Sequence, residues 1–373
     1  MSKQVLYVQP YVPHYRVPLF NALAEKLALR GDRLIVASGQ AEGAQAKRGD
    51  SITSQPWHIQ VDSSVWETPV GEFKYRRGLR DLFSQSDICI LELDVGNVNA
   101  WQALFPRPKK RGIVLWGHGK SYTRASRPSV ERVKTLLARR ASHVMTYTAS
   151  GRAHLISAGV PATQVTAVGN STDTAVLQER LHQRRLRDLS VSETFGLKIS
   201  GRTVAMYAGG LDGDKRVPFL TEASAAAHRL DERFLLLVAG SGEEESLLKP
   251  GIAAGYISHM RRADATELAD MAAVSKALWM PGRVGLVAVD AMALQIPVFS
   301  TPFPHHAPEY DFLTPGTDLQ ILTDSPDSFA EEALSHMANG PGLLHRRSSQ
   351  PVPNINDVVS NMMTVIDLTI SRM

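Results

Sequence analysis

Cysteine is nearly absent from this sequence of 373 residues, which contains only Cys89. A single cysteine excludes an internal disulfide bond and any zinc site built on cysteine ligands, and it suits a reducing compartment. Long apolar runs are also missing, since no segment approaches the roughly 20 residues of a membrane-spanning helix. The first ten residues lead straight into a strand-like segment and do not resemble a secretion signal. We therefore expect a cytoplasmic location.

Two phosphate-binding motifs are missing as well. A dinucleotide-binding domain would carry G-x-G-x-x-G after its first strand, but the first strand candidate is followed by PYVPHYRVPLF (10–20), which has no glycine. The P-loop motif G-x-x-x-x-G-K-[ST] does not occur. These absences argue against NAD or FAD binding through the first domain and against a P-loop nucleotide site.

The composition is that of an ordinary globular protein, with 43% hydrophobic and 21% charged residues. Its net charge of +4 is unevenly divided, because residues 1–190 carry 27 Lys and Arg against 15 Asp and Glu. Basic clusters occur at KYRRGLR (74–80) and RPKKRG (107–112). This half of the chain could contact an anionic membrane surface, although solvated helix faces would account for most of these residues individually.

Short apolar strands alternate with amphipathic helices throughout the chain, which predicts parallel sheets covered on both faces. The pattern is interrupted by the polar segment 176–202 and then restarts, so we expect two Rossmann-like α/β domains. A linker containing a helix would join them, and a final amphipathic helix occupies 355–373. The strand candidates are 4–9, 33–38, 87–93, 112–117, 143–148, 164–169, 203–210, 233–242, 254–259, 276–282 and 297–302.

Ligands of open α/β sheets bind beyond the carboxyl ends of the strands, so two facing domains should bind them in the cleft between the sheets. In the first domain, the loop after the first strand offers Tyr11, His14, Tyr15 and Arg16, which suit a sugar or a phosphate-linked acceptor. The alternative is a rigid, proline-shaped loop that only starts a helix. The segment WGHGKSY (116–122) places His118 between two glycines at a strand end, which indicates a functional histidine.

The second domain repeats this geometry twice. The segment AMYAGGLDGDKR (205–216) ends a strand at Gly209 and Gly210 and then supplies Lys215 and Arg216 as a helix begins. Backbone N–H groups, a helix dipole and two cations together predict an anion site, whereas a surface loop with incidental charges is the alternative.

The second instance is GRVGLVAVDAM (282–292), where a helix again follows a strand end. Gly285 and Leu286 would present N–H groups to an anion at the helix start. Asp290 lies about one turn further along, where its carboxylate could accept two hydroxyl hydrogen bonds, as a ribose provides. Periodicity alone would make it a buried acid of unknown purpose.

Six segments in this order resemble the GT-B glycosyltransferases, specifically the retaining family 4. The resemblance implies a GT-B fold in which an acceptor domain (1–175, joined by the helix 355–373) faces a nucleotide-sugar donor domain (203–354) across a cleft, with 176–202 as the linker. The segments are GVPATQVTAVGNSTD (159–173), YAGGLDGDKR (207–216), LLLVAGSGEE (235–244), ATELADMAAVSKALWMPG (265–282), VGLVAVDAMALQIPVFST (284–301) and HHAPEYDFL (305–313).

The resemblance also implies roles for individual residues. Lys215 and Arg216 would hold the donor diphosphate and stabilise the leaving group, and His118 would contact the transferred sugar. The other donor-binding residues would be Gly209, Gly210, Gly285, Leu286, Asp290 at the ribose, Met260 beside the base, and Glu309.

Three departures from the family pattern stand out. The family usually has two glutamates with seven residues between them, and here the first position is Gly282 and the second is Asp290. A basic residue is often found where this chain has Gly210, and the usual glycine-rich first loop is replaced by PYVPHYRVP. His305 or His306, together with Glu309, could replace the missing glutamate on the sugar side.

These features predict a retaining transferase that moves a sugar from a UDP or GDP donor to a hydroxyl of a glycan or lipid-linked acceptor. The setting would be assembly of bacterial cell-surface polysaccharide or glycolipid at the inner face of the membrane. We expect no cofactor, no essential metal and no nucleic-acid partner, because cations and helix-end amides would meet the diphosphate charge. The alternatives are a sugar-nucleotide 2-epimerase and a non-catalytic relative that binds a sugar nucleotide, the latter favoured by Gly282.

Overall fold

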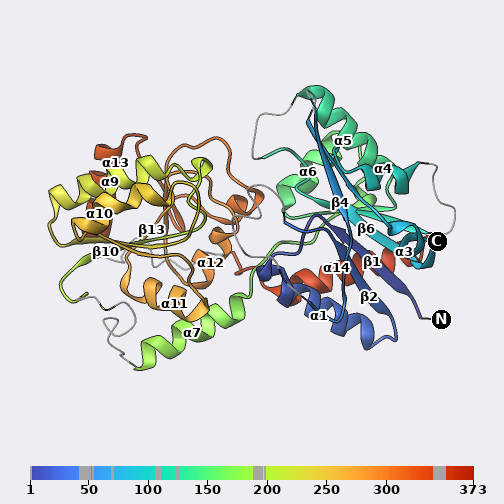
Figure 1. The fold of residues 1–373 in the computed structure, drawn as a ribbon, viewed down its shortest axis with the longest axis horizontal. Coiled ribbons are helices and arrows are strands. Elements are labelled where there is room, and N and C mark those ends of the chain that lie inside the picture. Colours follow the sequence, from blue (N-terminus) through green and yellow to red (C-terminus); the bar gives the residue numbers. More distant parts are fainter. Residues whose placement is uncertain are drawn as a thin grey trace. The chain divides into compact units, whose positions relative to one another are not determined.

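The computed structural model describes residues 2–41, 52, 54–68, 71–105, 111–122, 127–187, 196, 199–338 and 350–373. The chain folds into two compact units (Figure 1). We call Met1–Thr172 with Pro353–Met373 the N-terminal unit, and Asp173–Val352 the C-terminal unit. Two predicted features fall partly outside the described residues, namely the basic residues 107–110 and the linker residues 188–195 and 197–198.

The N-terminal unit is built on a parallel sheet with the strand order β3-β2-β1-β6-β7-β8-β9 in the described residues. An antiparallel hairpin, β4 (Ser63–Thr68) and β5 (Gly71–Arg76), accompanies this sheet. The strands of the sheet are β1 (Gln4–Gln9), β2 (Arg33–Ser38), β3 (His58–Gln60), β6 (Ile88–Glu92), β7 (Gly112–Gly117), β8 (His143–Thr146) and β9 (Val165–Ala167).

Helices cover both faces of this sheet because successive side chains of a strand point to opposite sides. On one face, Val5 and Tyr7 of β1 pack with α1 (Val17–Ala28) and α14 (Ile355–Ile370). On the other face, Leu6 and Val8 belong to a second core cluster with residues of the remaining helices of this unit. The sequence prediction that the C-terminal helix returns to the first domain is therefore confirmed. The helices of the second face are α3 (Leu79–Gln85), α4 (Val98–Leu104), α5 (Pro128–Arg140) and α6 (Ala149–Ser157).

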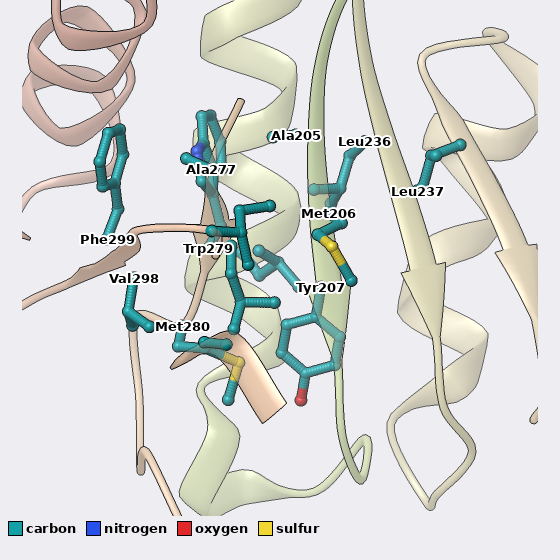
Figure 2. Close-up of a cluster of buried hydrophobic side chains, with 14 of the residues drawn as sticks. Ala205, Met206, Tyr207, Leu236, Leu237, Ala277, Trp279, Met280, Val298 and Phe299 are labelled. Carbon is teal, nitrogen blue, oxygen red and sulfur yellow. The ribbon is translucent and has the colours of Figure 1, made fainter. Parts of the chain in front are cut away.

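The C-terminal unit has a parallel sheet with the order β12-β11-β10-β13-β14-β15 in the described residues. Its strands are β10 (Thr203–Ala208), β11 (Phe234–Ala239), β12 (Ile257–Met260), β13 (Leu278–Trp279), β14 (Val298–Ser300) and β15 (Leu319–Ile321). Figure 2 shows part of the core between these strands, where Met206, Trp279 and Phe299 lie together. Tyr207 is fully buried there and points its hydroxyl oxygen towards the carboxyl ends of the strands.

Two groups of helices enclose the second sheet (Figure 1). One group contains α9 (Val217–Leu230), α10 (Lys249–Ala253) and α13 (Pro326–Ala338). The other contains α7 (Thr174–Arg187), α11 (Ala265–Val274) and α12 (Val287–Ala293). The helix expected within the linker is α7, and it packs on α11 through a buried ion pair between Arg184 and Asp270 at 3.0 Å.

Local sequence signals explain where several helices begin. Proline stands in the first turn of α1, α5 and α9, where its fixed φ suits the helix and no N–H is needed. The side chains of Asn97 and Thr148 accept the first free amides of α4 and α6. Asp264 and Glu267 form a capping box on α11. Within the described residues, no helix is long and apolar enough to cross a membrane.

Each sheet has one switch point, where the chain leaves a central strand and the next strands are added on its other side. In the N-terminal unit this lies between β1 and β6, and in the C-terminal unit between β10 and β13. Loops at the carboxyl ends of such strand pairs form the usual ligand crevice of open α/β sheets. The residues predicted from the sequence can therefore be judged by their positions around these two points.

Candidate active site

Of the four predicted acceptor residues in the loop after β1, two are buried and two are exposed. It continues into a 3-10 turn, His14–Arg16, that leads directly into α1. Tyr11 and Arg16 are buried, with exposed fractions of 8% and 5%. His14 and Tyr15 are exposed. Of the predicted group, only Tyr11 and Arg16 are therefore buried beside the switch point.

Arg16 lies in an aromatic environment. Its Cζ atom is 4.4 Å from the Trp116 ring centroid, 5.7 Å from that of Tyr147 and 5.4 Å from that of Tyr15. Its Nη2 donates a hydrogen bond of 3.4 Å to the Tyr147 hydroxyl. Burial alone would lower the pKa of Arg16, but the neighbouring phenol groups raise it above its ordinary value. The guanidinium is therefore charged and largely removed from water.

His118 follows β7, and the glycines around it serve packing within the unit. A Cβ on Gly119, whose φ is +80°, would lie 2.5 Å from the carbonyl oxygen of Gly151 in α6. The prediction assigned these glycines to close approach of a ligand, but at Gly119 the space is occupied by the α6 backbone. Burial, together with Lys134 and Arg16, lowers the pKa of His118 to about 4. The imidazole is therefore neutral at neutral pH and able to act as a hydrogen-bond partner.

Tyr147 connects the two predicted residues and was missed in the sequence. Its ring centroid lies 5.1 Å from that of His118, and its hydroxyl accepts the bond from Arg16. Its only sequence signal is position, because it immediately follows β8 at the carboxyl edge of the sheet. Tyr147 thus contacts both His118 and Arg16.

In the C-terminal unit, the loops after β10 and β11 touch through glycines. Gly209 has a φ of +153°, and a Cβ on Gly240 would overlap its carbonyl oxygen. Gly210 accepts a hydrogen bond through its carbonyl oxygen from the Tyr207 hydroxyl. A side chain at Gly240 would push the loop after β11 away from the loop after β10. Gly209, which was predicted to contact a donor, therefore takes part in the packing of these two loops, and Gly240 was not predicted.

Lys215 lies where the loops after β10 and β13 meet. Its Nζ donates a 2.6 Å hydrogen bond to the carbonyl oxygen of Arg283. The amide N–H of Arg283 donates to the carbonyl oxygen of Asp214 at 2.8 Å, and the two side chains form an ion pair. Arg283 was missed in the sequence, although a cation directly after Gly282 was a usable signal. Two cations thus lie beside each other at the second switch point.

Gly282 occupies the position where the resemblance leads one to expect a glutamate, and the structure leaves no room for a side chain. A Cβ there would lie 2.5 Å from both the Asp214 carbonyl oxygen and the Lys215 carbonyl carbon. Real Cβ atoms essentially never approach a backbone so closely. The glycine is therefore required by the close approach of the loop that carries Lys215.

Arg216 makes contacts within the protein. It has a φ of +56°, and its Nη1 donates to the Thr301 hydroxyl at 2.9 Å. The same nitrogen forms a 2.6 Å ion pair with Asp324, and the guanidinium lies 4.5 Å from the Phe219 ring centroid. These contacts fasten the start of α9 to the loop after β14. Of the two predicted cations, Lys215 has the surroundings better suited to a bound anion.

The remaining predicted donor residues border the same edge of the sheet. The carbonyl oxygens of Gly285 and Leu286 accept hydrogen bonds from Ala288 and Val289, so their amides face away from the helix. Asp290 lies in the first turn of α12 and is half-buried. Met260 ends β12, and its carbonyl oxygen accepts a hydrogen bond from Gly240.

His306 has a structural contact that distinguishes it from His305. Its Nδ1 accepts a 3.1 Å hydrogen bond from the amide of Val284, and its ring stacks on Tyr310 at 3.8 Å. Burial, Lys215 and Arg283 lower its pKa to about 4. Glu309 is buried, at 4% exposure, in the 3-10 turn Pro308–Phe312. His306 thus positions the loop beside Lys215, and His305 is half-buried next to it.

Within the described residues, no group of three or more His, Cys, Asp or Glu could hold a metal ion. The polar groups described at the two switch points are mainly cations, backbone amides and aromatic or imidazole rings. Such groups bind and orient negatively charged ligands and stabilise charge that develops on them.

Residues 202–339 match the family model described as glycosyl transferases group 1. No curated protein sequence matches the chain. Among solved structures, the chain is similar to sucrose-phosphate synthase from Thermosynechococcus elongatus, with 14% identity, a TM-score of 0.66 and 100% of both chains covered. The C-terminal unit thus contains a segment that matches a glycosyltransferase model.

Two further solved structures are similar over almost their whole length. One is Anabaena Alr3699/HepE in complex with UDP and glucose, with 13% identity, a TM-score of 0.60 and coverage of 98% of this chain and 100% of that chain. The other is a putative UDP-N-acetylglucosamine 2-epimerase from Listeria monocytogenes, with 12% identity, a TM-score of 0.66 and coverage of 100% and 98%. At these identities the likeness concerns the fold, and the predicted GT-B fold with two Rossmann-like domains is confirmed.

Proposed function

We propose that the protein is a retaining glycosyltransferase that moves a sugar from a nucleotide-diphospho-sugar to a hydroxyl acceptor. The observation that carries this proposal is the position of Lys215. Its ammonium group is fixed on the Arg283 carbonyl at the switch point of the C-terminal unit, inside the segment that matches the glycosyltransferase model. A fixed cation at this point suits the charge that develops on a departing diphosphate.

For the other residues we propose mainly the roles that the resemblance to family 4 implies. Lys215 and Arg283 bind the diphosphate together with the amides of Gly285 and Leu286, and Asp290 accepts the ribose hydroxyls. Met260 borders the base, and Arg216 positions the loop. His118 is neutral and hydrogen-bonds the transferred sugar. The leaving phosphate helps to take the acceptor proton in a front-face attack, so the pair of carboxylates used by glycosidases is not needed.

UDP is the nucleotide to test first, because related folds bind it, and GDP is the alternative. The acceptor is a glycan or lipid-linked glycan in the assembly of a bacterial cell-surface polysaccharide or glycolipid. The basic half of the sequence fits work beside an anionic membrane surface in the cytoplasm. No cofactor and no essential metal enter the proposed reaction.

A donor screen tests this function. The protein is heated with UDP, GDP, dTDP and their sugars, and one of them is expected to stabilise it by about 2.7 kcal/mol at a hundredfold excess over its dissociation constant. That donor is then incubated with and without acceptors, and the product is analysed by NMR. A glycoside with the donor's anomeric configuration supports the proposal.

Three other results contradict it in different ways. An epimer formed from the donor alone identifies an epimerase. Binding of a nucleotide sugar without transfer to any acceptor identifies a non-catalytic relative. Lack of stabilisation by every nucleotide contradicts the donor site itself.

A further inference from the structure

The protein neutralises its buried cations in two different ways. Four Lys or Arg residues are less than a tenth exposed in the described ranges, namely Arg16, Arg76, Lys134 and Arg184. Three of them have a carboxylate: Arg76 pairs with Glu92 at 3.6 Å, Lys134 with Glu131 at 3.3 Å and Arg184 with Asp270 at 3.0 Å. Buried charges are almost never left unpaired, because removing them from water is costly.

Arg16 is the exception. Among the described residues, no carboxylate lies within ion-pair distance of its guanidinium. The half-buried Glu92 pairs with Arg76 and acts on Arg16 only from a greater distance. Its partners are the rings of Trp116, Tyr147 and Tyr15, a hydrogen bond of 3.4 Å to the Tyr147 hydroxyl and a hydrogen-bonding interaction with the Tyr15 side chain. A desolvated cation–π contact contributes about 2 kcal/mol or more, and burying an ion costs several kcal/mol. The rings can therefore offset part of the cost of burying Arg16, but they do not supply the negative charge that the other three buried cations have.

The polar atoms around Arg16 are also incompletely satisfied. Its Nη1 and the indole N–H of Trp116 are buried without a hydrogen-bond partner. The buried hydroxyl of Tyr7 makes no hydrogen bond of normal geometry, although Gln9 is near it. All three groups can donate a hydrogen bond, so the acceptor missing from this cluster is one that carries oxygen atoms and negative charge.

We infer that Arg16, Tyr147 and Tyr7 form an oxyanion-binding site at the switch point of the N-terminal unit, which takes a carboxylate or phosphate of the acceptor. The inference rests on the proposed function, because it defines the acceptor as an anionic molecule. Arg16 supplies two N–H groups in a plane that matches a bidentate oxyanion. Tyr15 is exposed and Tyr147 half-buried, so these two phenols border the side open to a ligand.

Two sources of the oxyanion are distinguished by the probes. Inorganic phosphate stands for a phosphate-linked acceptor, D-glucuronate for an acidic sugar, and sodium chloride at equal ionic strength is the reference. The titrations use the full-length Lys215→Ala variant, which weakens phosphate binding at the proposed donor site, and exchange of residues 10–16 reports on the N-terminal unit by itself. Unfolding temperature and hydrogen exchange of residues 10–16 are recorded.

We expect phosphate or glucuronate, but not chloride, to raise the unfolding temperature and to slow exchange of residues 10–16. The anion that binds more tightly identifies the source. Arg16→Gln should raise the dissociation constant at least tenfold and Tyr147→Phe several-fold. Arg76 is the matched control, because it is also buried but pairs with the carboxylate of Glu92. Arg76→Gln should destabilise the fold but leave the dissociation constant of the anion unchanged. Equal effects of the three anions, or an unchanged constant in Arg16→Gln, would overturn the inference.

If Arg16→Gln does not fold, hydrogen exchange of the Lys215→Ala variant decides the question. Exchange that either oxyanion slows selectively at residues 10–16 supports the site, and the absence of this slowing refutes it. UDP binding by the wild-type protein is measured in parallel. Stabilisation by UDP without an effect of either oxyanion contradicts only this inference. Lack of stabilisation by every nucleotide contradicts the proposed function.

Discussion

The two units place a cation at the same topological position and surround it differently. In the N-terminal unit, Arg16 follows the strand before the switch point and is buried among aromatic rings. In the C-terminal unit, Lys215 follows the equivalent strand and is held by a backbone carbonyl, with Arg283 beside it. Glycines provide the space for this second arrangement. The same fold thus prepares one enclosed and one more accessible positive charge.

This difference indicates what each ligand must supply. The Lys215 ammonium group is half-buried and donates to a carbonyl oxygen, so binding of the proposed diphosphate there should respond to salt. The charge on Arg16 is already removed from water, so its ligand gains a strong hydrogen bond without further desolvation of the cation. Three predictions sharpen this comparison.

The largest expected effect is on the rate of sugar transfer. Lys215→Ala should lower the rate roughly a hundredfold, since it removes one preorganised charge from the leaving group. Arg216→Ala should lower it less than about tenfold, because Arg216 is bonded to Thr301 and Asp324. Initial rates at saturating donor measure both. Equal rates for Lys215→Ala and the wild type would remove Lys215 from the site.

A smaller effect is expected on stability at the junction of loops in the C-terminal unit. Gly282→Ala should lower the free energy of unfolding by about 1–3 kcal/mol, because its methyl group would overlap the backbone of residues 214 and 215. Gly213→Ala is the matched control, since its nearest neighbour would be 3.8 Å away at Glu244 Oε1. Its change should stay within about 0.5 kcal/mol in urea unfolding. Equal stability of the two variants would disprove the steric role of Gly282.

The smallest effect concerns the response to acid. Burial lowers the pKa of His58, His118 and His143 in the N-terminal unit, and that of His306 in the C-terminal unit. As pH falls below 6.5, these histidines take up protons in the unfolded state before the folded state does, so folding stability decreases. The loss is at most about 1.4 kcal/mol per pH unit for each histidine and ends near their folded pKa.

The N-terminal unit should therefore lose more stability than the C-terminal unit between pH 7 and 5. Hydrogen exchange of α1 and α9, corrected for the intrinsic pH dependence of exchange, measures the two separately. His143→Gln should reduce the pH dependence in α1 and leave α9 unchanged. An equal response of both helices in the wild type would contradict the assignment of these pKa values.

Much of the fold could be predicted from apolar periodicity. The strands 4–9, 33–38 and 112–117 begin and end as expected, because each is a short apolar run between polar residues. The hairpin of β4 and β5 was missed, since β4 is mostly exposed, β5 is mostly half-buried and neither contains such a run. The strand expected at 276–282 is only Leu278–Trp279, because the chain turns after Met280 to meet the loop after β10.

The candidate site was predicted less completely, because it depends on contacts between distant loops. The motif around Lys215 could be recognised, but its carbonyl partner on Arg283 lies 68 residues further along the chain. Gly282 seemed to be the loss of a functional side chain, and only the position of residues 214 and 215 explains it. Likewise, no periodicity could show that Arg16 turns inward while Tyr15 remains exposed.

The packing of α14 has a consequence for the order in which the protein forms during synthesis. Val358, Met362, Val365 and Ile366 complete one core of the N-terminal unit, yet the ribosome makes them after the whole C-terminal unit. The C-terminal unit is continuous in sequence and can fold as soon as it emerges. The unit that begins first is thus finished last, and the apolar surface of β1 and α1 that α14 covers stays open until the end of synthesis.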